Sequence, residues 1–281
     1  VDVLVGPQYS TLAIPAGAVA EFSQVPMIAP MASHADVTAG RRFVTRLAFL
    51  DDLQGKVLAR FAHDSLGIRR AAVLYAAASQ YGRQIAVVFD SAFRNVGGTS
   101  VTIERFDADE GTEQRPQLRR ILAQRPDAIL LPSFIGDVAV HIRVARELGF
   151  RGIFLAPDSW DIVPVIKSRM AIGGLVAANW DTRATREPSR RFVDRYVARY
   201  GEPPRAPGAA AYDAVHVLAI AAQRAGQRSG GALADSVRNL GRYEGVLSAF
   251  DFQGSGDPAR SVFLLQITPD TFTVRAEVRE P

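Results

Sequence analysis

Cysteine is absent from the 281-residue chain. This absence excludes disulfide bonds, metal-thiolate sites and thiol nucleophiles, and it suits an oxidising compartment as well as the cytosol. No run reaches the roughly 18 consecutive apolar residues that a membrane-spanning helix needs. No charged segment followed by an apolar one opens the chain, as in a secretory signal. Composition alone therefore leaves the compartment open.

Lysine is nearly absent too, so arginine carries almost all of the positive charge behind the formal net charge of +4. The arginine pairs lie far apart and mostly alternate with apolar positions at helical spacing, which is typical of solvated helix faces. They are Arg41 with Arg42, Arg69 with Arg70, Arg119 with Arg120, and Arg190 with Arg191. We therefore expect no nucleic-acid partner.

Motifs of catalysis are missing as well. The chain has no G-x-S-x-G, Walker or G-x-G-x-x-G pattern. Its histidines show no metal-ligand spacing; they are His34, His63, His141 and His216. We expect no metal, no cofactor and no enzymatic activity.

What the sequence does contain is a regular alternation of strands and helices. Hydrophobic residues make up 48% of the chain, enough for a full core, and the length favours two domains. Strand-like segments begin near residues 71, 100, 127 and 153, and helical segments lie between them. This spacing is that of one strand-helix repeat, which predicts an α/β protein with parallel sheets.

The two ends of the chain differ from this repeat. The last segment, residues 262–278, reads as two antiparallel strands joined by a Thr-Pro-Asp turn. At the other end, residue 1 already lies in a strand that reads as buried. We therefore expect that an upstream part of the chain is missing.

Polar and aromatic residues gather where the predicted strands end. Ligands of open α/β sheets bind at the carboxyl ends of the strands. Hydroxyls and a helix N-terminus, which favours an anion, follow the first strands, and aromatic rings and one carboxylate follow the later ones. Such a set suits a zwitterion such as an amino acid. The candidates are Tyr9, Ser10, Met31, Ser33, Tyr81, Phe134, Asp158 and Trp160.

Each candidate also has a plainer interpretation. Ser10, Ser33 and Asp158 are residue types that cap the helices following them. The rings of Tyr81 and Phe134 are equally expected in the core or at its rim. The ring of Trp160 could pack only against its own lobe.

Six segments carry a family resemblance, and in chain order they are GPQYS, PMASH, SQYGRQ, LAPDSW, AYDAV and FDFQGSGD. With these separations, nearly the whole chain resembles the periplasmic solute-binding proteins of branched-chain amino-acid ABC transporters, of the leucine/isoleucine/valine type. The resemblance implies the type I periplasmic binding protein fold, in which two Rossmann-like lobes with parallel central sheets, joined by a three-crossover hinge, close on a ligand. It also implies further N-terminal residues upstream of residue 1.

The same resemblance implies the lobe boundaries. Crossovers are expected around residues 47–51, 178–181 and 249–252. The first lobe would hold residues 1–48 and 180–249. The second would hold residues 49–179 and 250–281.

Roles for the first-lobe candidates follow from the resemblance. The hydroxyl of Ser10 would bind the ligand carboxylate, with Tyr9 beside it. The carbonyl of Met31 would accept from the ammonium group. Ser33, where the family has threonine, would lie near both charged groups.

From the second lobe, Tyr81 would pair with the ligand carboxylate and Asp158 would neutralise the ammonium group. Phe134 would stand where the family often has a tyrosine beside the ligand side chain, and Trp160 would line or support the mouth of the site. Asp158 is shorter than the family's glutamate, which leaves room for a ligand larger than leucine.

The resemblance thus implies an extracytoplasmic solute-binding protein that captures an amino acid or related small carboxylate and delivers it to the membrane permease of an ABC transporter. The location would be periplasmic or extracellular, with a lipid anchor on the missing segment as one option. The alternative is the ligand-sensing domain of a receptor or transcriptional regulator with the same fold.

Overall fold

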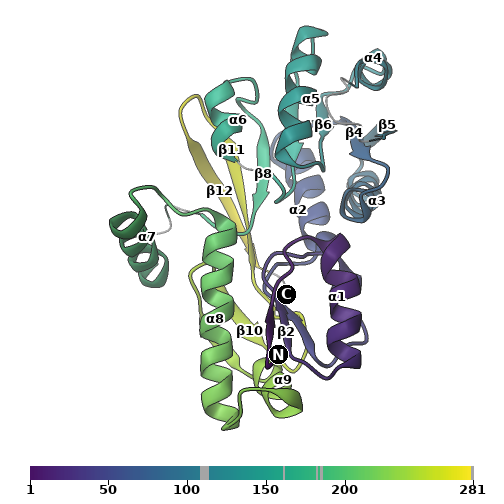
Figure 1. Ribbon diagram of the computed structural model, residues 1–281. Coiled ribbons are helices and arrows are strands. Elements are labelled where there is room, and N and C mark those ends of the chain that lie inside the picture. Colours follow the sequence, from purple (N-terminus) through teal and green to yellow (C-terminus); the bar gives the residue numbers. More distant parts are fainter. Residues whose placement is uncertain (108–113, 161, 182, 184–185, 280–281) are drawn as a thin grey trace. The chain divides into compact units, whose positions relative to one another are not determined.

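The computed structural model describes residues 1–107, 114–160, 162–181, 183 and 186–279 (Figure 1). The chain forms two compact units. Unit 1 consists of residues 1–50, 179–262 and 279–281, and unit 2 of residues 51–178 and 263–278. Each unit is built from segments that are distant in the sequence.

Unit 2 is organised around a seven-stranded sheet of order β12-β11-β8-β7-β6-β4-β5. The strands are β4 (Arg70–Ala76), β5 (Thr99–Phe106), β6 (Ala128–Leu130), β7 (Ile153–Ala156), β8 (Leu175–Ala178), β11 (Ser261–Ile267) and β12 (Phe272–Arg279). The pairs from β5 to β8 are parallel, whereas β11 runs antiparallel to β8. The predicted parallel sheet with an antiparallel tail is therefore confirmed.

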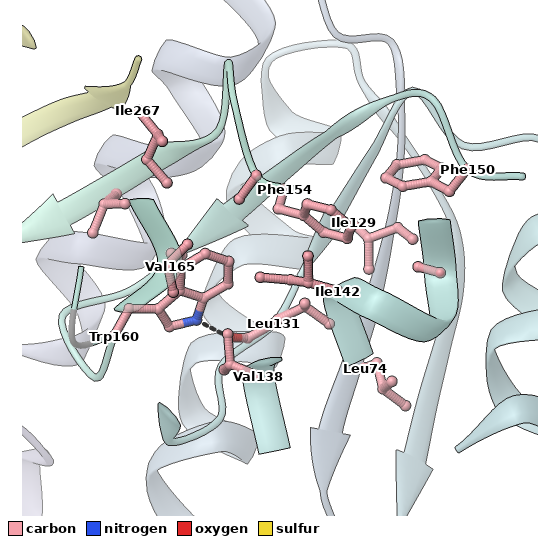
Figure 2. Close-up of a cluster of buried hydrophobic side chains, with 14 of the residues drawn as sticks. Leu74, Ile129, Leu131, Val138, Ile142, Phe150, Phe154, Trp160, Val165 and Ile267 are labelled. Atoms are coloured by element: carbon pink, nitrogen blue, oxygen red, sulfur yellow. Dashed lines mark hydrogen bonds between the residues drawn. The ribbon is translucent and has the colours of Figure 1, made fainter. Parts of the chain in front are cut away.

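Apolar residues on both faces explain why these strands form the centre of unit 2. Successive strand residues point to opposite faces. Leu74, Ile129 and Phe154 pack with helices α4 (Arg115–Ala123) and α5 (Ile135–Glu147) in one hydrophobic cluster, part of which is drawn in Figure 2. The alternate residues Val73 and Leu130 are equally buried. A sheet with two buried faces needs helices on both, as the bare apolar runs predicted.

Helices α2 (Asp51–Asp64) and α3 (Gln80–Asn95) pack against each other, and α3 also contacts β4 and β5. Ser79 caps α3, since its hydroxyl accepts a hydrogen bond from the backbone N–H of Gly82. Gly97 follows the helix with a φ of +92°, a conformation that glycine adopts without strain. A short helix, α6 (Ile162–Ser168), comes after β7.

Unit 1 contains a three-stranded parallel sheet of order β1-β2-β3, formed by β1 (Leu4–Val5), β2 (Met27–Ala29) and β3 (Val44–Arg46). Helix α1 (Ser10–Phe22) and helix α8 (Ala206–Ala225) flank this sheet (Figure 1). The unit also contains the 3-10 helix η1 (Ala35–Val37), α7 (Glu187–Tyr200), α9 (Gly230–Arg238), β9 (Gly241–Glu244) and β10 (Ala249–Phe252). Buried alanines let α8 pack closely, as its composition predicted.

The division into units differs from the predicted lobes mainly at the third passage of the chain, which lies between residues 262 and 263 and not around 249–252. Strand β10 pairs antiparallel with β9, and Asp251 forms an isolated bridge with Ala259. These pairings keep residues 249–262 in unit 1.

Candidate functional site

Asp158 lies at the carboxyl end of β7 in unit 2, directly after Pro157. Its half-buried carboxylate accepts hydrogen bonds at one oxygen, Oδ1, from two helices. The Tyr81 hydroxyl on α3 donates at 2.8 Å, and the Gln54 side-chain amide on α2 donates at 3.2 Å. The acid after the apolar strand is therefore held by tertiary contacts. Its other interpretation, a cap on the following helix, concerns residue 161, which lies outside the described residues.

Gln54 makes a second contact with the same residue. Its Oε1 accepts from the backbone N–H of Asp158 at 3.0 Å, and its Nε2 also donates to Asp51 Oδ1 at 2.9 Å. Gln54 and Asp51 are both buried, with exposed fractions of 0% and 1%. One amide thus joins two carboxylates and one backbone N–H in the interior of unit 2.

The phenol of Tyr81 is buried beside these acids. Burial raises the pKa of Tyr81 well above its ordinary value, and the charges of Asp158 and Asp51 raise it further. The hydroxyl therefore stays protonated and acts as a donor to Asp158. The role that the resemblance implied for Tyr81, pairing with a ligand carboxylate, stays a prediction.

Phe134 is the exposed aromatic neighbour of this group. It directly precedes α5, and 41% of its surface is exposed. Its ring stacks on that of Tyr81, with ring centroids 6.0 Å apart. The pair offers an apolar surface next to the acid. The structure therefore brings Tyr81, Phe134 and Asp158 together, as predicted from their places at strand ends.

Trp160 lies in the core of unit 2. Only 6% of it is exposed, its ring packs in the cluster drawn in Figure 2, and its Nε1 donates to the carbonyl of Leu131 at 2.9 Å. Beside it, the Ser159 hydroxyl donates to the carbonyl of Ser133 at 2.8 Å. These contacts fasten the segment that carries Asp158. Trp160 therefore packs within its own unit, where it can support the segment with Asp158 but offers little surface to a ligand.

In unit 1, Ser10 is the first residue of α1, and the preceding Tyr9 occupies the N-cap position without a side-chain cap bond. The Ser10 hydroxyl accepts from the backbone N–H of His34 at 3.2 Å. Ser10 is thus not the cap of its helix, and its hydroxyl contacts the loop after β2. Tyr9 is half exposed, at 51%.

The loop after β2 contains Met31, half buried, and Ser33, buried with 2% exposed. The side chain of Arg46, at the end of β3, binds this loop. Its guanidinium donates to the carbonyls of Ala32, His34 and Ala35 at 3.3, 2.8 and 3.2 Å. It also donates to the Thr38 hydroxyl at 2.6 Å and to Asp257 Oδ1 at 2.5 Å. A fully buried charge therefore fixes the conformation around Ser33.

Gln54 and Arg46 were missed by reasoning from the sequence. Gln54 lies inside a helix and Arg46 ends a short strand, so neither has a position in the sequence typical of a ligand-binding residue in an α/β fold. Gln54 is 104 residues from Asp158, and Arg46 is 211 residues from Asp257.

Within the described part of the chain, no three histidine, aspartate or glutamate side chains are grouped so that they could hold a metal ion. None of the described helices has the length and apolar character to cross a bilayer.

Known proteins resemble this chain along most of its length. The leucine-, isoleucine-, valine-, threonine- and alanine-binding protein of Pseudomonas aeruginosa is 24% identical over 266 residues, covering 90% of this chain and 70% of that protein. A leucine-binding protein of Thermotoga maritima superposes with a TM-score of 0.91 at 29% identity, over 99% of this chain and 80% of that one.

A branched-chain amino-acid transporter binding protein of Streptococcus pneumoniae, solved with isoleucine, gives a TM-score of 0.88 at 25% identity, over 98% of this chain and 79% of that one. The family model for periplasmic binding proteins matches residues 1–271. A match of this extent, on a fold shared with binding proteins of branched-chain amino-acid transporters, means that the chain belongs to the periplasmic binding protein family.

Proposed function

We propose that this protein captures an amino acid, or a related small carboxylate bearing an ammonium group, and delivers it to the permease of an ABC transporter. The observation that carries the proposal is Asp158, a half-buried carboxylate held at a strand end by Tyr81 and Gln54. A carboxylate in a partly dry setting is the natural partner of an ammonium ion. Relatives named for leucine and isoleucine binding support the ligand class.

The residues of unit 1 are proposed to recognise the other end of the same ligand. The N-terminus of α1 favours an anion, and Ser10 and Ser33 supply hydroxyls close to it. The carbonyl of Met31 and the exposed ring of Tyr9 complete the set. Each of these roles stays a prediction.

In the second unit, the proposal keeps Asp158 as the counter-charge and Phe134 as an apolar wall. It gives Tyr81 a supporting task, because its hydroxyl already donates to Asp158. The protein would act outside the cytoplasmic membrane, as its family does, and would bind without converting its ligand. A lipid anchor on an upstream segment is compatible with this proposal.

Binding of L-leucine and of 4-methylpentanoate, which is leucine without its amino group, tests the role of Asp158. Replacement Asp158→Asn removes the counter-charge, so leucine should lose about 2 to 4 kcal/mol of binding free energy. Titration calorimetry should show a much smaller change for 4-methylpentanoate. Mass spectrometry should recover leucine unaltered after incubation.

Two results would count against the proposal. One is leucine affinity that does not change in Asp158→Asn. The other is a wild-type protein that binds no member of a panel of amino acids, judged by the melting temperature, which a bound ligand raises.

A further inference from the structure

We infer that Gln54 is a positioning residue: its side-chain amide fixes both the backbone and the carboxylate of Asp158, and so directs that charge at the ammonium group of the ligand. The inference rests on the proposed function for its consequence. Its geometric basis lies wholly within unit 2 and is independent of any ligand.

The orientation of the Gln54 amide follows from its partners. The backbone N–H of Asp158 can only donate, so the amide atom that faces it at 3.0 Å must be the oxygen. The NH2 group is then turned toward the acids, and it donates to Asp51 Oδ1 at 2.9 Å and to Asp158 Oδ1 at 3.2 Å. A flipped amide would set a donor against the N–H and an acceptor against two carboxylates.

These contacts constrain Asp158 at two points. The bond to its backbone N–H holds the start of the segment after β7, and the bond to Oδ1 restricts rotation of the carboxylate. The Tyr81 hydroxyl reaches the same oxygen from a different helix at 2.8 Å. Donors on α2 and α3 therefore bind the same oxygen atom, and together they fix the orientation of the Asp158 carboxylate.

The amide also keeps two like charges apart. Asp51 and Asp158 both accept from the same NH2 group, so its positive hydrogens lie between the two acids. Because Gln54 is fully buried, water cannot take over that role at the amide itself. Loss of the NH2 group would let the carboxylates repel each other and would move the carboxylate of Asp158.

Two variants distinguish the bond from Gln54 to the Asp158 backbone from its bond to the Asp158 carboxylate. Gln54→Glu keeps an oxygen facing the Asp158 N–H but sets an oxygen against the acids. Gln54→Met fills similar space and removes both bonds. Gln84→Met is the matched control, because the Gln84 amide on α3 donates to Asp52 at 2.8 Å and makes no recorded bond to Asp158 among the described residues.

Backbone hydrogen exchange in the ligand-free protein, measured by NMR, tests the geometry. The Asp158 N–H should exchange at least about ten times faster in Gln54→Met than in the wild type, because it loses its acceptor. It should stay protected in Gln54→Glu and in Gln84→Met. Unchanged exchange in Gln54→Met would overturn the inference.

Binding tests the consequence. Gln54→Met and Gln54→Glu should each weaken L-leucine by roughly 10- to 50-fold and 4-methylpentanoate by less than about threefold. In an Asp158→Asn background, Gln54→Met should cost leucine almost nothing more, since the two residues act as one. Equal losses for both ligands would mean that Gln54 only supports the fold, and would overturn the inference.

The two proposals fail separately. If the wild type binds no amino acid, the proposed function is wrong, while the exchange of the Asp158 N–H still decides whether Gln54 holds that residue. If leucine binds and the Gln54 variants bind it as the wild type does, the proposed function stands and the inference is wrong. Gln54→Glu keeps the test open if Gln54→Met does not fold.

Discussion

His141 is a buried residue whose titration makes the free energy of unfolding depend on pH. Its ring lies in the core of unit 2 with 1% exposed, edge-on to Phe106 at 4.8 Å between centroids. Its Nδ1 has no hydrogen-bond partner among the described residues. Burial lowers the pKa of His141 to about 4. The folded protein therefore holds this ring neutral, whereas the unfolded chain protonates it near pH 6.5.

The sign of the pH dependence follows. Between about pH 6.5 and pH 4 the unfolded state binds the proton and the folded state does not, so stability falls as the pH falls. His141 should account for a loss of about 3 kcal/mol in the free energy of unfolding between pH 7 and pH 4. Urea unfolding of His141→Leu at both pH values should lack this part of the loss. His216→Leu, at an exposed position, should retain it.

At the scale of elements, the loop after β2 depends on one side chain of β3. Arg46 donates to three loop carbonyls and to the Thr38 hydroxyl, and it pairs with Asp257. A planar guanidinium reaches several acceptors at once, whereas a lysine ammonium is a single point. Arg46 therefore ties together the strand, the loop with Ser33 and the segment after β10.

Replacement Arg46→Lys should keep the pair with Asp257 but release loop carbonyls. We expect at least a tenfold loss of leucine affinity by calorimetry, with a smaller loss of stability than in Arg46→Met. Arg46→Met removes the guanidinium from the loop carbonyls and from Asp257, which keeps the Thr38 hydroxyl, and should lower the free energy of unfolding in urea by about 3 kcal/mol.

Arg42→Lys is the control for Arg46, since Arg42 pairs with Asp235 at an exposed position. Its loss should stay below about 1 kcal/mol. Equal effects of the Arg42 and Arg46 variants would contradict the role given to Arg46.

Across the whole molecule, three segments that lead from one unit to the other meet at Arg260 in unit 1. Its buried guanidinium donates to the carbonyl of Leu47 at 2.6 Å and to the carbonyl of Asn179. It also lies over the rings of Phe49 and Phe250. All three donor and acceptor residues stand within a few positions of a passage between units. Arg260 thus joins the three segments of unit 1 at which the chain passes to or from unit 2.

Removal of this guanidinium should destabilise unit 1. Arg260→Met removes one donor from each of two carbonyls and a positive charge near the buried Asp213, so we expect the free energy of unfolding in urea to fall by about 3 kcal/mol or more. Arg242→Met, at an exposed pair with Glu244, should change little. A melting temperature for Arg260→Met equal to that of the wild type would refute this assignment.

The sequence was informative where structure is local and less so where it is not. The strand-helix repeats and the antiparallel tail follow from apolar periodicity, which neighbouring residues determine. The last passage between units was predicted too early, because the bridge between Asp251 and Ala259 arises only after folding. The candidate site was predicted from residues at the strand ends, and their roles toward a ligand stay predictions. The residues that hold them, Gln54 and Arg46, act on partners far along the chain and leave no periodic signal.

The hydrogen bonds from Tyr81 and Gln54 to Asp158 have a further consequence for the thermodynamics of the proposed ligand binding. Freezing a mobile side chain during association costs about 0.5 to 1.5 kcal/mol. In the proposed site that entropy is already lost when unit 2 folds, so the ammonium group of a ligand would meet its counter-ion in a fixed position. Substitution of apolar neighbours such as Phe134 would then change which ligand side chain is preferred, while the proposed ion pair with Asp158 would stay the same.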